Sequence, residues 1–283
     1  MSTRLKIFHQ TTYEYSQPVT LGNHKLLVRP RDGHDIRIEA SMLDMNPGGL
    51  ISWHRDELDN SVALVTFSDV ETTQLTITSE VTVAHYLSER SYVPIEPHVA
   101  TYPFEYNDHE RDLLSAYFAV KEQTAQVESW ITGHTSNNND TLSLLQQLSS
   151  AIKNDFTYQE RYEEGVQSPD ETLNLAMGTC RDYAWLFVIA ARRLGLAARF
   201  VSGYFHTAGT SLADGSTHAW AEVYLPGSGW TGFDPTADRI VGENHVPVSV
   251  AINPIDIPPV SGRFTGPKDV ETTLTVRVNV NQV

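Results

Sequence analysis

Cysteine is almost missing from this sequence: Cys180 is the single one among 283 residues. One cysteine cannot form a disulfide within the chain, which is typical of proteins from a reducing compartment. Long hydrophobic runs are missing as well, since no apolar stretch approaches membrane-spanning length and residues 1–18 alternate instead of forming a signal-peptide core. We therefore predict a cytoplasmic protein with no membrane partner.

Positive charge is scarce too. The chain has 20 Lys and Arg against 35 Asp and Glu, a formal net charge of -15. Nucleic acids and anionic membranes are bound through basic patches, so this balance argues against both as partners. His206 and His245 have no second and third ligand at metal spacing in the sequence, and we expect no metal or other cofactor. The sequence does not indicate an oligomeric state.

The composition that remains is that of a globular protein, with 40% hydrophobic and 19% charged residues in a chain long enough for two domains. In the first hundred residues, short alternating segments separated by Pro, Gly or Asn predict a β-sandwich. Pro94, Pro97 and Pro103 mark a boundary. We predict an N-terminal β-sandwich domain over residues 1–103 and a second domain over residues 104–283.

Helical and extended patterns both occur beyond this boundary, which predicts an α+β fold. Helices are expected after Asp108, around 127–131, after Asp140, and from Cys180 to Gly195. Strands are expected over residues 197–204, 218–225, 230–233 and 274–280. The Pro- and Gly-rich segment 252–266 is predicted to be irregular, and the loop 207–217 is predicted to border a cleft and to move.

Cys180 lies in the first turn of a predicted helix. Thr179 is a suitable N-cap, and Asp182 three residues later gives a capping-box-like arrangement. The positive end of the helix dipole favours the thiolate, which is the form that attacks carbonyl carbon. A lone cysteine is also commonly a small buried core residue, so this position alone leaves both roles open.

A reactive cysteine of the acyl-transfer type needs a base that takes its proton and a third group that orients this base. His218 begins one strand of a predicted hairpin and Asp234 ends the other, on either side of the turn Pro-Gly-Ser-Gly at 226–229. Antiparallel pairing would bring the carboxylate back toward the imidazole.

The register of this hairpin decides whether the two side chains meet. If Leu225 pairs with Trp230, Asp234 points to the face opposite His218. If Tyr224 pairs with Trp230, the two share a face and lie within side-chain reach. We predict the second register, produced by a five-residue loop or a bulge.

Four blocks of sequence resemble a known family. They are GTCRDYA at 178–184, RFVSGY at 199–204, HAWAEVY at 218–224 and GWTGFDPT at 229–236. In this order they look like the bacterial transglutaminase-like family, often labelled "putative cysteine protease". The N-terminal part resembles the β-rich region that precedes the core in one bacterial branch, with corresponding residues at Tyr13, Tyr15, Pro18-Val19, Arg29-Pro30-Arg31 and Asp59-Asn60.

The resemblance implies a papain-like core in which a helix bearing Cys180 packs on an antiparallel sheet bearing His218 and Asp234. Cys180 would be the nucleophile, His218 the general base and then acid, and Asp234 the group that orients His218, with no cofactor. The Cys180 amide would form part of the oxyanion hole, whose second donor the sequence does not indicate. The resemblance also implies a departure, because many relatives carry an Arg-Asp pair where this chain has Ile252 and Asn253. If that pair binds substrate in relatives, we expect specificity or activity to differ here.

The predicted function is hydrolysis of an amide bond, or acyl transfer from it, on a peptide or other amide-containing substrate through a thioacyl-enzyme. Water is the favoured acceptor because no dedicated amine site is evident. Two other functions stay open: a non-catalytic binding or scaffold protein whose N-terminal sandwich engages a partner, and a structural protein that uses its acidic surface.

Overall fold

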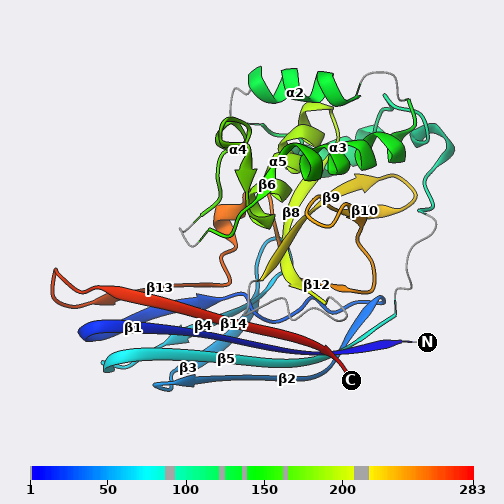
Figure 1. The fold of residues 1–283 in the computed structure, drawn as a ribbon. Coiled ribbons are helices and arrows are strands. Elements are labelled where there is room, and N and C mark those ends of the chain that lie inside the picture. The colour runs from blue at the N-terminus through cyan, green and yellow to red at the C-terminus, as the bar shows by residue number, and fades with distance from the viewer. Residues whose placement is uncertain (1, 87–92, 121–124, 136–138, 162–164, 207–216) are drawn as a thin grey trace.

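The computed structural model describes residues 2–86, 93–120, 125–135, 139–161, 165–206 and 217–283. Three layers are stacked in Figure 1, with helices at the top, a five-stranded sheet in the middle and a seven-stranded sheet at the bottom. Within these ranges, every helix is too short or too polar to cross a bilayer. The α+β class predicted from the sequence is confirmed.

The N-terminal strands form one curled antiparallel sheet where the sequence predicts a sandwich. The long strand β1 lies at the centre of this sheet and pairs with β14 along one edge and with β5 along the other. Because the sheet curls, its apolar side chains enclose a core of their own, which includes Leu26, Val65 and Leu75. The strands are β1 (Thr3–Leu26), β2 (Ile36–Asn46), β3 (Leu50–Arg55), β4 (Ser61–Thr66), β5 (Glu71–His85), β13 (Val260–Thr265) and β14 (Thr272–Gln282).

The last strand belongs to this N-terminal sheet. β14 pairs with β1 from Gln282 opposite Leu5 to Thr272 opposite Tyr15, and β13 pairs with the later part of β1. The sequence predicts that these residues belong to the second domain, 104–283, and that the segment 252–266 is irregular. The pairing of β13 and β14 with β1 corrects both predictions. Alternation shows that one face of a strand is buried, but it does not show which sheet supplies the partner. The boundary at residue 103 stays a prediction.

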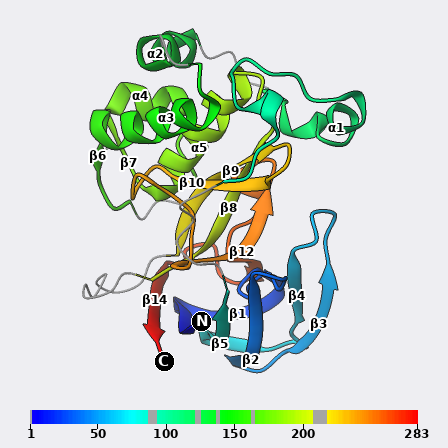
Figure 2. The ribbon, with the colours of Figure 1, turned by 90° about the vertical axis from the view of Figure 1, so that its right-hand side faces the viewer.

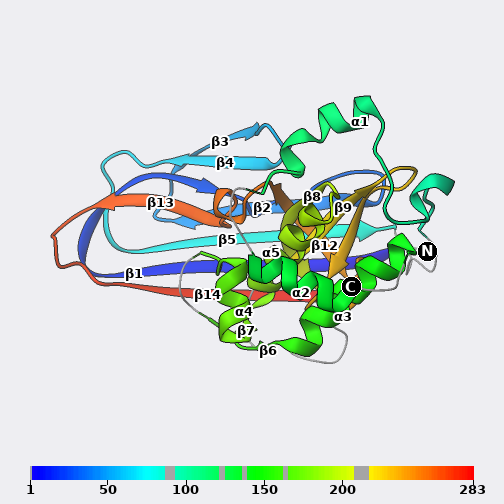
Figure 3. The same ribbon diagram turned by 90° about the horizontal axis from the view of Figure 1, so that it is seen from above.

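The second sheet has the order β11-β10-β9-β8-β12, and α5 packs on one of its faces, where the rings of Phe187 and Phe233 stack 5.6 Å apart. Seen from above in Figure 3, α2, α3 and α4 lie beside α5. The strands are β8 (Ala198–Phe205), β9 (His218–Leu225), β10 (Gly229–Asp234), β11 (Arg239–Ile240) and β12 (His245–Ala251), and β6 (Thr157–Tyr158) and β7 (Met177–Gly178) form a separate parallel pair. The helices are α1 (Asp108–Leu113), α2 (Ala125–Thr135), α3 (Thr141–Asp155), α4 (Pro169–Leu175) and α5 (Cys180–Arg193), with 3-10 turns η1 (Pro97–Val99), η2 (Ser115–Tyr117) and η3 (Pro254–Asp256).

Asn60 joins the two sheets. β12 is the edge strand that faces the N-terminal sheet, as Figure 2 shows from the side. The Asn60 amide donates to the Val250 carbonyl (2.9 Å) and accepts from the Val250 N–H (2.8 Å), so it satisfies this edge as a neighbouring strand would. Arg31 donates to the same Asn60 oxygen (3.0 Å). Two of the residues noted in the N-terminal resemblance therefore hold this region on the core.

Asn60→Ala is expected to lower the free energy of unfolding by about 3 kcal/mol, because the substitution leaves two buried backbone groups of Val250 unpaired. Asn60 itself is 0% exposed. Urea denaturation measures the change. Asn279→Ala, at an exposed position of β14, is the control and should change stability by less than about 0.5 kcal/mol. Equal stability of the two variants would show that the Asn60 clamp contributes nothing.

Candidate active site

Cys180 lies in the first turn of α5, as predicted. The buried Asp182 carboxylate accepts from the Thr179 amide (2.8 Å) and hydroxyl (2.9 Å) with one oxygen. Its other oxygen accepts from the Gln167 amide (2.7 Å) and the Arg161 guanidinium (3.0 Å). The start of the helix, and with it the position of Cys180, is thereby fixed by two segments outside the helix.

The hairpin has the register that brings His218 and Asp234 to one face. Trp230 lies opposite Tyr224, as predicted. Leu225 also lies opposite Gly229, so three residues, 226–228, form the turn where the sequence predicts a five-residue loop or a bulge. A hydrogen bond from the Ser228 amide to the Leu225 carbonyl (2.9 Å) closes this turn. Two glycines adopt the positive φ angles that such a tight connection requires, Gly227 and Gly229.

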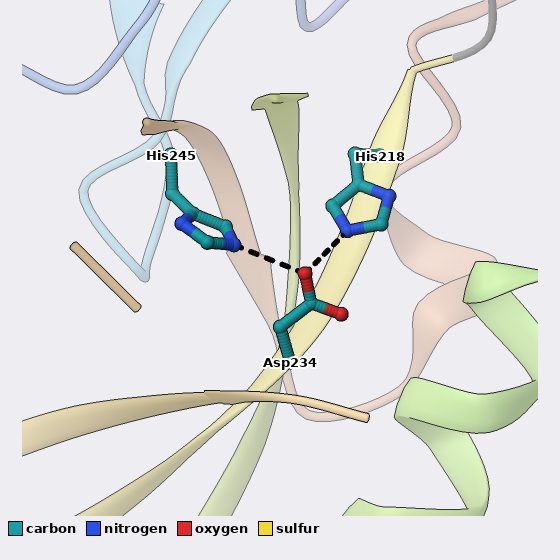
Figure 4. A group of neighbouring side chains, drawn as sticks. All are labelled: His218, Asp234 and His245. Carbon is teal, nitrogen blue, oxygen red and sulfur yellow. Dashed lines mark hydrogen bonds and ion pairs between the residues drawn. The ribbon is translucent and has the colours of Figure 1, made fainter. Parts of the chain in front are cut away.

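One carboxylate oxygen of Asp234 accepts hydrogen bonds from two imidazoles. Its Oδ2 lies 2.8 Å from Nε2 of His218 and 3.0 Å from Nε2 of His245, and Figure 4 shows the two rings on either side of the carboxylate. Its Oδ1 accepts from the amides of Thr236 (2.9 Å) and Ala237 (3.1 Å). Both oxygens are therefore satisfied, and the carboxylate is fixed in orientation.

The charges of this group follow from burial and from proximity. Burial alone would lower the pKa of His218, but Asp234 and Cys180 outweigh it and raise this pKa to about 10. Burial alone would raise the pKa of Asp234, but His218 and His245 hold it well below its usual value. Burial lowers the pKa of His245. The arrangement therefore favours a charged Asp234, a protonated His218 and a neutral His245 that donates Nε2–H.

His218 also interacts with the side chain of Cys180. Because Nε2 of His218 faces Asp234, the nitrogen left for the sulfur is Nδ1. The sulfur also lies 3.9 Å from the carbonyl of Thr217, the residue before His218, and the Cys180 side chain is only 4% exposed. The structure thus brings together all three predicted site residues in the order thiol, imidazole, carboxylate.

His245 is the site residue that the sequence analysis missed. The expectation that it lacks neighbouring ligand-type groups is wrong, because the donor atoms of His218, Asp234 and His245 lie within 4.8 Å of one another. Zinc ligands converge on an ion at about 2.0–2.2 Å. Here both imidazole nitrogens approach the same carboxylate oxygen at hydrogen-bond distance, so the three groups satisfy one another and do not surround a shared centre.

Several residues of the four blocks have structural roles around this site. Trp220 is fully buried, and its ring meets His245 edge-on at 5.2 Å. A Cβ on Gly203 would lie 2.6 Å from the Trp220 ring and 2.3 Å from a backbone oxygen, so only glycine fits beneath it. Tyr204 binds His9 through its hydroxyl (2.8 Å), and Glu222 pairs with Arg199 (2.7 Å).

The two residues that replace the relatives' Arg-Asp pair follow β12. The Ile252 carbonyl accepts from Arg192 (2.8 Å), and the Asn253 side chain accepts from the Ile255 amide (3.1 Å) at the start of η3. Their effect on specificity or activity stays a prediction. Residues 207–216 of the loop predicted to border the cleft lie outside the described residues.

Comparison with known proteins finds two matching families and several relatives. The family model of the transglutaminase-like superfamily matches residues 126–235, and that of the bacterial transglutaminase-like N-terminal region matches residues 5–84. An uncharacterized protein of Mycobacterium tuberculosis is 29% identical over 276 residues, covering 92% of this chain and 87% of the relative. One of Mycobacterium leprae is 24% identical over 283 residues, covering 97% and 98%.

A solved structure shares the whole fold. The "Putative Cysteine Protease from Cytophaga hutchinsonii" superposes with a TM-score of 0.74 at 19% identity, covering 100% of this chain and 91% of that one. At this identity the likeness concerns the fold alone. The two matched regions contain the first five strands of the N-terminal sheet, apart from the start of β1 and the end of β5, and the segment that carries Cys180, His218 and Asp234. The chain therefore has a transglutaminase-like core in residues 126–235 and, in front of it, a bacterial transglutaminase-like N-terminal region in residues 5–84.

Proposed function

We propose that this protein is a cysteine-dependent enzyme that cleaves a peptide-like amide bond, or transfers an acyl group from it, through a thioacyl-enzyme. One observation carries the proposal: Cys180, in the first turn of α5, lies beside His218 and its side chain interacts with this imidazole, and His218 is in turn bonded to the buried Asp234. A nucleophile, a base and a group that orients the base are the parts that acyl transfer needs.

The geometry supports the following steps. His218 takes the thiol proton and holds it as an imidazolium, which its raised pKa favours. The thiolate sulfur of Cys180 then attacks the amide carbonyl carbon while the carbonyl π electrons move onto the oxygen. The Cys180 amide N–H, at the start of α5, stabilises this oxyanion in part. The electron pair then returns, the C–N bond breaks, and His218 protonates the leaving amine. Water or a second amine attacks the thioester with His218 again as base, and the thiol is restored.

Asp234 and His245 act on this chemistry through His218. A buried carboxylate beside two imidazoles stabilises the imidazolium that forms each time the sulfur loses its proton. His245 holds Asp234 from the side opposite His218 and is thereby a positioning residue. Water is the proposed acceptor, and hydrolysis is the proposed outcome.

Alkylation of Cys180 tests the proposal. At pH 6 iodoacetamide should modify native Cys180 faster than a model thiol of pKa about 8.5, because an imidazolium neighbour stabilises the thiolate. His218→Ala should lower this rate by at least about tenfold, whereas His98→Ala, at a half-exposed position, should leave it unchanged. Mass spectrometry follows the modification. A rate equal to that of the model thiol, or no reaction, would favour the scaffold function instead.

A further inference from the structure

The Cys180 amide is one donor of an oxyanion hole, and such sites generally have a second. β6 carries a polar side chain to the start of α5. It pairs in parallel with β7, so that Tyr158 lies opposite Gly178, two residues before Cys180. The amides of Thr157 and Gln159 donate to the carbonyls of Ala176 and Gly178, each at 3.0 Å, which fixes this register. Tyr158 is therefore tied to the backbone that leads directly into the nucleophile.

The hydroxyl of Tyr158 lies beside Cys180, close enough to interact with its side chain and with its backbone amide. The ring packs edge-on against Tyr183, with centroids 6.1 Å apart, and the residue as a whole is 46% exposed. Burial of the hydroxyl end and the nearby Cys180 raise the pKa of Tyr158 above its usual value, so the phenol keeps its proton and can donate it.

We propose that the hydroxyl of Tyr158 is the second donor of the oxyanion hole. The Cys180 amide and the phenol already meet beside the sulfur in the free protein. A carbonyl oxygen whose carbon is under attack by that sulfur must lie within this same space, where it would accept the amide N–H and the phenol O–H together. This inference rests on the proposed function, because it concerns the carbonyl addition that Cys180 would perform.

Two reactions of Cys180 separate this role from others. Iodoacetamide is attacked at a saturated carbon and loses iodide, so no oxyanion forms. With p-nitrophenyl acetate, the Cys180 sulfur bonds to the carbonyl carbon, the π electrons form an oxyanion, and their return breaks the bond to p-nitrophenolate and leaves an S-acetyl group on Cys180. Only the second reaction needs an oxyanion hole.

Tyr158→Phe should therefore react with iodoacetamide at the wild-type rate and release p-nitrophenolate in the acylation burst about 10²-fold more slowly. Tyr183→Phe is the matched control: it removes the hydroxyl of the adjoining ring, which has no hydrogen-bond partner among the described residues, and both rates should stay unchanged. Stopped-flow absorbance and mass spectrometry give the two rates.

Other outcomes overturn the inference. Acylation of Tyr158→Phe at or above the wild-type rate would mean that the phenol does not assist, or competes with the substrate for the amide. A parallel loss of both rates would mean that Tyr158 acts on the thiol itself. If wild-type Cys180 alkylates no faster than a model thiol, the proposed function fails first, and this result is distinct from the other two.

Discussion

Asp234→Asn is expected to slow acylation of Cys180 by about 10³- to 10⁴-fold while the protein stays folded. The carboxylate accepts hydrogen bonds from His218, His245 and two backbone amides. An amide of the same shape keeps part of this pattern, but it removes the negative charge that stabilises the imidazolium of His218. It also lets His218 adopt the tautomer that cannot accept the thiol proton.

The sign of the pH effect follows from the same charge. Asp234 raises the pKa of His218, so the pKa of His218 should fall in Asp234→Asn. The imidazolium is then lost at a lower pH, and alkylation of Cys180 by iodoacetamide at pH 6 should slow as well. Asp256→Asn, at an exposed position in η3, is the control and should match the wild type. Wild-type rates in Asp234→Asn would remove Asp234 from the proposed mechanism.

The titration of His9 should lower the free energy of unfolding by about 3 kcal/mol when the pH falls from 6.5 to 4. His9 is 3% exposed, and burial lowers its pKa from 6.5 to about 4. In this window the unfolded chain binds a proton at His9 and the folded protein does not, so a lower pH favours unfolding. Below about pH 4 both states are protonated, and the contribution of His9 is lost completely.

Urea denaturation at several pH values between 4 and 7 measures this dependence. His9 bonds to the Tyr204 hydroxyl (2.8 Å) and to Thr11 (3.1 Å), and His9→Gln can keep hydrogen bonds without titrating. Its stability should fall less steeply with acid than that of the wild type, whereas His98→Gln should follow the wild type. A residual slope is expected in His9→Gln, because burial also lowers the pKa of His24, His85 and His245. Parallel curves for wild type and His9→Gln would contradict the prediction.

Local rules were enough to predict how Cys180, His218 and Asp234 come together. The start of α5 follows from the capping pair Thr179 and Asp182, and the face of Asp234 follows from the hairpin register. Both depend on residues close together in the sequence. His245 reaches the site because β12 lies beside β8, and Tyr158 reaches it because β6 lies beside β7. The periodicity of a single strand does not show which strands lie next to it in the sheet.

Some elements were missed for other reasons. α4 has a readable start, since Ser168 and Glu171 form a capping box around Pro169, but it is a short helix of seven residues and is not among the helices predicted from the sequence. In β12 the alternation is interrupted at Pro247, where the pairing with β8 shifts register. The exposed strand β3 has almost no buried face, so it gives no period-2 pattern.

The pairing of β1 with β14 sets an order for folding during synthesis. A ribosome makes β1 early and β14 only after every strand and helix of the core. The segment with Cys180, His218 and Asp234 can therefore assemble while one long edge of β1 still has unpaired backbone groups. Such an edge readily pairs with strands of other chains, and the nascent protein is most prone to aggregate in this interval. By pairing with this edge, β14 thus prevents β1 from pairing with other chains, and this role is separate from any chemistry at Cys180.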